Sequence, residues 1–252
     1  MLKVDFQLNK EYLARVMISK SRMPVGFANY LWDKYRYSYK KLKKQVNDDT
    51  IDKGILDELY TQEFFNDNLK SAENNLLRIK ENWNNKQEKI QSFLKTLLRV
   101  NIDLKVKAYI IPANLDSGRN IGGNCFIWGH SNGLTDENYD LVYVVHESLH
   151  SFFERGNLTH AIIENIADIE LAKYLNNSRI GYGCHSFTLE DHVKIYPYWN
   201  LYLNIDKQDI ALDQVCTQIN YDVDAYEKER KYLSSLNINE FVEYLKAKIK
   251  KY

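Results

Sequence analysis

The sequence has few cysteines and no long hydrophobic run. Three cysteines in 252 residues are too few for a disulfide scaffold, and no C-x-x-C pair indicates a zinc ribbon or a redox site. No stretch of about 18 apolar residues occurs, so we expect no membrane-spanning segment. The N-terminal residues lack the apolar core of a signal peptide, and we therefore expect a cytoplasmic protein.

An excess of charge of either sign is also absent. The chain has 34 Lys and Arg against 34 Asp and Glu, so its net charge is zero when histidine is neutral. Nucleic acids and anionic membranes attract strongly basic proteins, and we expect neither as a partner. The basic, tyrosine-rich segment 33–44 is typical of a solvated helix face.

Residues suited to turns and to metal coordination are concentrated in the middle of the chain. All six histidines lie between His130 and His192, and eight of the ten glycines lie between Gly118 and Gly183. Glycine permits tight turns, and histidine is a common metal ligand and acid–base group. We therefore expect the chemistry in this central stretch.

The first hundred residues have the periodicity of amphipathic helices. Apolar residues recur every three to four positions over 69–100, which predicts one long helix. The N-terminus is helix-like in composition, and shorter helices are expected over 11–19, 28–45 and 50–60. Pro24 separates the first two of these. The sequence thus predicts a helical N-terminal region.

The pattern changes after this region. Alternating apolar and polar residues over 104–112 predict a half-exposed strand, and 121–128 is predicted to be a second strand. Further helices are predicted over 136–154, over 159–175 and, in pieces, from 189 to the end. We therefore predict an α+β, predominantly helical fold with a small mixed sheet. We expect two regions, 1–103 and 104–252, that form one compact unit.

One motif has the pattern of a metal site. The helix predicted over 136–154 contains His146-Glu-Ser-Leu-His150, which is H-E-x-x-H. Residues four apart lie on one face of a helix, so both imidazoles can bind the same metal ion. Glu147 can reach a metal-bound water without binding the metal itself. The motif thus predicts a metal centre with Glu147 as general base.

A metal ion held by two histidines needs a third protein ligand. Glu164 lies on the second turn of the next predicted helix and can face back toward His146 and His150. Asp168 lies one turn further on the same face, where it can hold a histidine ligand by its far ring nitrogen. His160, one turn before Glu164, is an alternative third ligand.

This constellation resembles the gluzincin class of zinc metalloproteases, which includes thermolysin and the peptidase-MA-like families. The resemblance covers 121–175 and implies a thermolysin-like catalytic core with paired active-site helices. It implies one Zn²⁺ ion held by His146, His150 and Glu164. Asp168 would accept a hydrogen bond from one of the two histidine ligands. Thirteen residues separate His150 from Glu164, fewer than in thermolysin, which leaves the exact family open.

The resemblance also implies zinc-dependent hydrolysis of peptide bonds. Glu147 would take a proton from the zinc-bound water and pass it to the leaving amine. A tyrosine or histidine from a later loop would stabilise the oxyanion. Spacing does not choose among the candidates, which are Tyr182 and His185, then His192, Tyr196 and Tyr198.

The resemblance further implies where substrate binds. In this class an edge strand just before the motif helix pairs with an extended substrate, and 121–128 resembles that strand. Gly123, Asn124, Cys125 and Phe126 are therefore expected to bind a peptide or protein substrate. The sequence leaves the oligomeric state open.

Two other functions stay open at this point. One is a regulatory protease-like protein that cleaves a single partner, such as a repressor. The other is a non-catalytic binding module stabilised by its metal, with the helical N-terminal region as its interaction surface.

Overall fold

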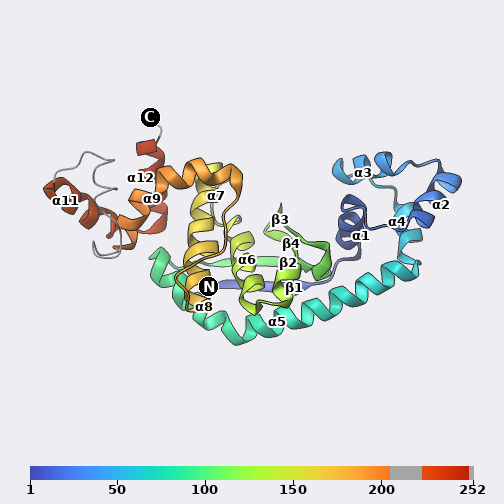
Figure 1. The fold of residues 1–252 in the computed structure, drawn as a ribbon, viewed down its shortest axis with the longest axis horizontal. Helices are drawn as coiled ribbons and strands as arrows, with labels where there is room; N and C mark the ends of the chain where they lie inside the picture. The colour runs from blue at the N-terminus through green and yellow to red at the C-terminus, as the bar shows by residue number, and fades with distance from the viewer. Residues whose placement is uncertain (205–222, 250–252) are drawn as a thin grey trace. The chain divides into compact units, whose positions relative to one another are not determined.

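The computed structural model describes residues 1–204 and 223–249 (Figure 1). These residues are mostly helical and include one four-stranded mixed sheet, which confirms the predicted α+β class. Cys216 and the helical pieces predicted within 205–222 and 250–252 lie outside the described residues. Within the described residues, every helix is too short or too polar to cross a membrane.

The secondary structure elements follow one another along the chain without a repeated pattern. Their order is β1 (Leu2–Gln7), α1 (Lys10–Ser19), α2 (Val25–Tyr35), α3 (Tyr39–Asn47), α4 (Lys53–Tyr60), α5 (Glu63–Leu98), β2 (Leu104–Ile110), η1 (Ala113–Leu115), β3 (Ser117–Gly122), β4 (Cys125–Gly129), η2 (Ser131–Leu134), α6 (Glu137–Leu149), α7 (Asn157–Glu164), η3 (Asn165–Leu171), α8 (Ala172–Asn176), η4 (Ser186–Thr188), α9 (Leu189–Leu203), α11 (Val223–Leu233) and α12 (Ile238–Ile249).

The chain divides into two compact units. The first, which we call the sheet unit, comprises Lys3–Lys86 and Lys105–Ser151. The second, the helical unit, comprises Met1–Leu2, Gln87–Leu104 and Phe152–Tyr252. Each unit combines stretches that are far apart in the sequence. The division into 1–103 and 104–252 follows the chain linearly and stays a prediction.

The sheet has the strand order β1-β2-β4-β3 (Figure 1). β2 and β4 are parallel, with Ile110 opposite Trp128, and β3 runs antiparallel to β4. Residues of β2 are alternately buried and exposed, which confirms the half-exposed strand predicted there. β1 corrects the expectation of a helical N-terminus: Leu2 and Phe6 are buried at the even spacing of a strand.

The segment predicted as one strand over 121–128 is a hairpin. β3 ends at Gly122, the turn is made by Gly123 and Asn124 with left-handed φ of 57° and 56°, and β4 begins at Cys125. The prediction was wrong because two glycines followed by asparagine favour a turn with positive φ. β3 is consequently an edge strand, and β4 is an inner strand.

α2 and α3 replace the single helix predicted over 28–45. Arg36 adopts a left-handed conformation with φ of 54°, and its N–H bonds the carbonyl of Trp32 at 2.8 Å. Ser38 then caps α3 by accepting a hydrogen bond from the Lys41 N–H at 3.2 Å. Neither residue is a glycine or proline, so hydrophobic periodicity alone did not show the break.

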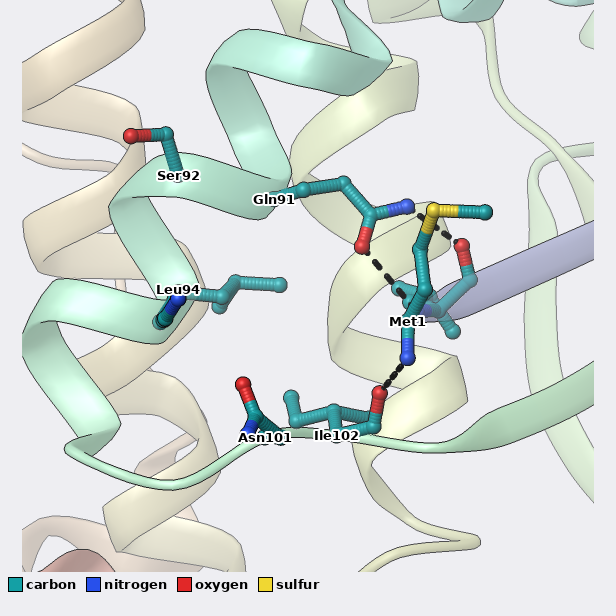
Figure 2. A pocket seen from close by; sticks show the side chains of 8 residues that line it. Met1, Gln91, Ser92, Leu94, Asn101 and Ile102 are labelled. Atoms are coloured by element: carbon teal, nitrogen blue, oxygen red, sulfur yellow. Dashed lines mark hydrogen bonds between the residues drawn. The ribbon is translucent and has the colours of Figure 1, made fainter.

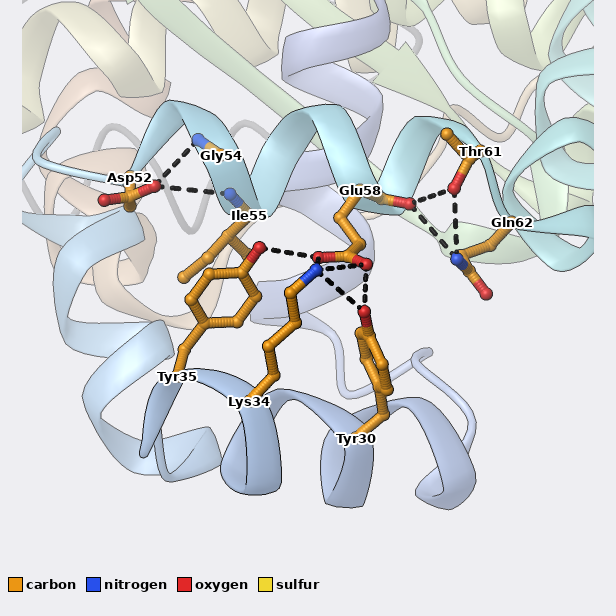
Figure 3. A network of polar contacts seen from close by, with 9 residues as sticks. All are labelled: Tyr30, Lys34, Tyr35, Asp52, Gly54, Ile55, Glu58, Thr61 and Gln62. Atoms are coloured by element: carbon orange, nitrogen blue, oxygen red, sulfur yellow. Dashed lines mark hydrogen bonds and ion pairs between the residues drawn. The ribbon is translucent and has the colours of Figure 1, made fainter.

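A polar cluster joins α2 to α4 in the sheet unit (Figure 3). Glu58 accepts hydrogen bonds from Lys34 at 2.8 Å, from Tyr35 at 2.6 Å and from Tyr30. The Lys34 ammonium also lies over both tyrosine rings. These donors, with Lys34 first, lower the pKa of Glu58 to about 2. The cluster therefore holds a carboxylate anion between two helices.

Candidate functional site

In the sheet unit, helix α6 carries His146 and Glu147 of the H-E-x-x-H motif, and His150 is the C-cap of the helix. The side chain of Asp136 caps its start, and the rings of His146 and His150 lie 5.0 Å apart between centroids. The Ser151 N–H bonds the Ser148 carbonyl at 2.9 Å, which tightens the last turn, so α6 ends before the predicted residue 154. The two imidazoles are neighbours, and the apolar residues Leu141, Val144, Val145 and Leu149 of α6 are buried.

The Glu147 carboxylate lies beside the edge strand β3. A Cβ atom at Gly118 would lie 3.4 Å from Glu147 Oε1 and 2.4 Å from the ring of Trp128, so the position accepts only glycine. Asn120, also on β3, donates from Nδ2 to the Glu147 carbonyl at 3.2 Å. The general base predicted from the sequence is therefore placed against the strand at the sheet edge.

The residues predicted to bind substrate do not form that edge. Cys125 and Phe126 lie on β4, with β2 paired on one side and β3 on the other. Their backbone groups are thus engaged within the sheet, and the expectation that they form an edge strand is wrong. Gly123 and Asn124 form the hairpin turn. The edge lies at β3 instead.

An ion pair of the buried Asp140 anchors α6 to its neighbours. Asp140 accepts a hydrogen bond from Trp128 Nε1 at 2.7 Å and pairs with Arg78 of α5 at 2.6 Å. Burial raises the pKa of Asp140, and the contacts with Trp128 and Arg78 oppose this rise only in part. Arg78 also donates to the carbonyl of Gly133 at 2.6 Å. The pair fixes the rotation of α6 two turns before the motif.

The helix predicted over 159–175 exists but changes its winding after Glu164. α7, η3 and α8 are continuous, and η3 (Asn165–Leu171) is a π-helix, a form found frequently at functional sites. Both Glu164 and Asp168 are fully buried. The Asp168 carbonyl accepts a hydrogen bond from the Tyr182 N–H at 2.6 Å, so a later segment docks on the π-helix.

That later segment holds both carboxylate oxygens of Glu164. Oε1 accepts the His185 N–H at 2.7 Å and lies 2.5 Å from His185 Nδ1. Oε2 accepts the Thr188 hydroxyl at 2.6 Å and lies 2.7 Å from His192 Nε2. His160 Nε2 lies 3.7 Å from Oε1. Glu164 is therefore a buried carboxylate among three imidazoles and one hydroxyl.

The hydrogen bonds determine the charge of Glu164. Burial by itself raises the pKa of this carboxyl, but the hydrogen bonds from His185, His192 and Thr188 outweigh it and hold the pKa well below its usual range. The side chain is an anion in the folded protein, which is the form that a metal ion requires.

A second set of possible metal ligands shares Glu164. One donor atom each of His160, Glu164 and His185 lies within 4.8 Å of the other two, all in the helical unit. Imidazole nitrogen and carboxylate oxygen are donors that zinc accepts. His160, the alternative ligand suggested by its spacing, is thus beside the predicted third ligand.

The predicted oxyanion candidates fall in different surroundings. His185 lies on the carboxylate just described, and His192 joins it. The Tyr182 hydroxyl accepts a hydrogen bond from Asn176 Nδ2, at the end of α8, at 3.0 Å. Tyr196 is exposed on α9, and the Tyr198 ring packs against α12. The structure therefore brings the two histidines together with Glu164.

Two further residues of this segment, Thr188 and Gly181, were not predicted from the sequence. Thr188 bonds Glu164, and the spacing of Thr188 and His192, four residues apart, could have indicated two donors on one helix face. Gly181 lies against the π-helix, where a Cβ atom would be 2.6 Å from Ile169 Cα and 2.7 Å from the Asp168 carbonyl. Glycine therefore allows the segment to dock.

A separate hollow of about 340 Å³ lies in the helical unit (Figure 2). The Gln91 amide donates to the Leu2 carbonyl at 2.6 Å and accepts the Leu2 N–H at 3.1 Å. The eight residues that line the hollow include Lys95 but no histidine and no acidic side chain. The lining thus lacks the groups used for metal binding or general base catalysis.

Comparison of the chain with protein family models, with curated proteins and with solved structures found no match. A function for this protein must therefore be inferred from the residues of this chain. They provide a paired imidazole face with an adjacent carboxylate on α6, and a buried carboxylate anion at the end of α7.

Proposed function

We propose that this protein is a zinc-dependent peptidase of the gluzincin type with a thermolysin-like catalytic core. The observation that carries the proposal is the position of the Glu147 carboxylate beside Gly118, on the antiparallel edge strand β3. An extended peptide can add to such an edge by main-chain hydrogen bonds. A peptide on β3 would pass close to Glu147.

The proposed ligands of one Zn²⁺ ion are His146, His150 and Glu164. The two histidines are ring neighbours at the end of α6, and Glu164 is a buried anion, so the donors suit zinc in type and charge. The histidine pair and Glu164 are close in the sequence, since only thirteen residues separate His150 from Glu164. Asp168 is proposed to hold a histidine ligand by its far nitrogen.

The proposed reaction assigns a step to each residue. When bound, zinc supplies a water of lowered pKa and polarises the scissile carbonyl. Glu147 accepts a proton from that water and delivers it to the leaving nitrogen. His185 and Tyr182 are the proposed donors to the oxyanion. Asn120 holds the backbone of Glu147 against β3.

The proposed substrate is a peptide or protein in extended conformation, and the proposed location is the cytoplasm. The balanced charge of the chain supports neither nucleic acid nor an anionic membrane as a partner. The scarcity of cysteine supports the proposed compartment.

The decisive experiment compares the wild type with Glu147→Gln. Hydrolysis is measured with a library of fluorogenic peptides, and metal content by elemental analysis. We expect the substitution to lower the rate by about 10²–10⁴-fold, because the general base is lost, and to leave the bound zinc unchanged. Undiminished hydrolysis by Glu147→Gln would contradict the mechanism.

A second pair of variants separates the two ligand sets. We expect His150→Ala to lose zinc and His160→Ala to retain it. The reverse result would assign the metal to His160, Glu164 and His185. If the wild type binds zinc, cleavage of a single cellular protein would support the regulatory protease, and cleavage of none would support the binding module.

A further inference from the structure

The two oxygens of the Glu164 carboxylate have unequal surroundings. Oε2 is bonded by the buried Thr188 hydroxyl and by His192, whose side chain is 13% exposed. Oε1 accepts the His185 N–H at 2.7 Å and lies beside the rings of His160 and of His185, whose side chain is 48% exposed. One oxygen therefore points into the protein and the other toward groups nearer the surface.

We propose that Thr188 and His192 are positioning residues that hold Oε2, so that Oε1 is the single atom of Glu164 that binds the metal ion. The inference rests on the proposed function, since it takes Glu164 as a metal ligand. It applies to either ligand set, because Glu164 belongs to both. Neither Thr188 nor His192 is itself a member of those sets.

The donors on Oε2 leave little room for a metal bond there, whereas the two rings beside Oε1, those of His160 and His185, can themselves be ligands of the same ion. Thr188 precedes α9 and His192 lies one turn into it, so both side chains come from one helix face. The Thr188 hydroxyl also lies 2.7 Å from the His185 carbonyl, but it has one proton, and a charged carboxylate is the stronger acceptor. Oε2 thus accepts a hydroxyl and an imidazole hydrogen bond together.

The segment that carries these donors is fixed independently of any metal. The Tyr182 N–H bonds the Asp168 carbonyl, and Gly181 packs on Ile169 of the π-helix. At its other end the segment continues into α9, which packs on α7. The carboxylate is therefore oriented before a metal arrives, which lowers the entropy lost when it binds.

The test measures zinc affinity by competition with a chromogenic chelator. We expect Thr188→Val and His192→Phe, which remove a donor to Oε2, to weaken zinc binding by about 10–100-fold. Thr188→Ser and His192→Gln keep a donor and should restore most of the affinity. Thr96→Val, an exposed threonine on α5, is the matched control and should bind zinc like the wild type.

Thermal melts of the metal-free proteins separate positioning from folding. Weaker zinc binding by variants that melt like the wild type supports the proposal. Wild-type affinity in folded Thr188→Val and His192→Phe would overturn it while leaving the zinc site in place, whereas a wild type that binds no zinc would overturn both. If Thr188→Val does not fold, the His192→Phe and His192→Gln pair decides.

Discussion

Two glutamates in different parts of this chain have similar hydrogen-bonding patterns. Glu58 of the sheet unit accepts hydrogen bonds from three side chains, and so does Glu164 of the helical unit. The pKa of each carboxyl is lowered. A crowded carboxylate with a low pKa is therefore not enough to mark a functional site in this protein.

The difference lies in burial and in the chemistry of the donors. The side chain of Glu58 is 16% exposed and its donors are Lys34, Tyr30 and Tyr35, of which the Lys34 ammonium balances its charge. Glu164 is fully buried, and its donors include imidazoles that can also bind metal. The comparison favours a structural role for Glu58 and a chemical role for Glu164.

The largest expected effect comes from replacing each glutamate by glutamine. Glu164→Gln should weaken zinc binding by at least about 100-fold, more than the loss expected from an outer partner, because a charged ligand is removed. Glu58→Gln should leave zinc affinity unchanged. Both are measured by chelator competition. Equal zinc affinity in the two variants would contradict the assignment of a chemical role to Glu164 and a structural role to Glu58.

The next effect concerns the docking of the segment that holds Glu164. Gly181→Ala should lower the free energy of unfolding by about 1–3 kcal/mol, because the new methyl would press on the backbone of Ile169 and Asp168. Gly183→Ala is the control, since nothing lies within 4 Å of its added Cβ. Urea unfolding measures both. A Gly181→Ala variant with the free energy of unfolding of the wild type would show that the segment around Gly181 can move away from the π-helix.

The sequence predicted the features that depend on local spacing. The four-residue interval of His146 and His150 placed two rings side by side at the end of α6, and the same interval placed Glu164 and Asp168 in one buried helix stretch. The alternation in β2 gave a correct strand. Each of these depends on residues within one or two helix turns or along one strand.

The features that were missed depend on backbone conformation or on distant contacts. Asn124 and Arg36 take left-handed φ values, which turned a predicted strand into a hairpin and split a predicted helix. Thr188 is 24 residues beyond Glu164, and it belongs to a segment that docks on the π-helix through Gly181. Periodicity describes one element at a time and does not register such contacts.

The smallest expected effect is the pH dependence that Glu58 gives to stability. Because folding lowers the pKa of Glu58 from 4.5 to about 2, its contribution to the free energy of unfolding is complete above pH 4.5. The contribution is lost as the pH falls from 4.5 toward 2. The stability difference between the wild type and Glu58→Gln should therefore shrink between pH 6 and pH 3, as measured by urea unfolding.

An exposed ion pair provides the comparison for this prediction. Glu190 pairs with Lys194 one turn along α9, and this contact also lowers the pKa of the carboxyl. Glu190→Gln should show a smaller change over the same pH range, because one solvated pair lacks the two tyrosine donors. If the difference between the wild type and Glu58→Gln is the same at pH 6 and pH 3, the cluster does not hold Glu58 as an anion. The low pKa would then distinguish Glu164 from Glu58 after all.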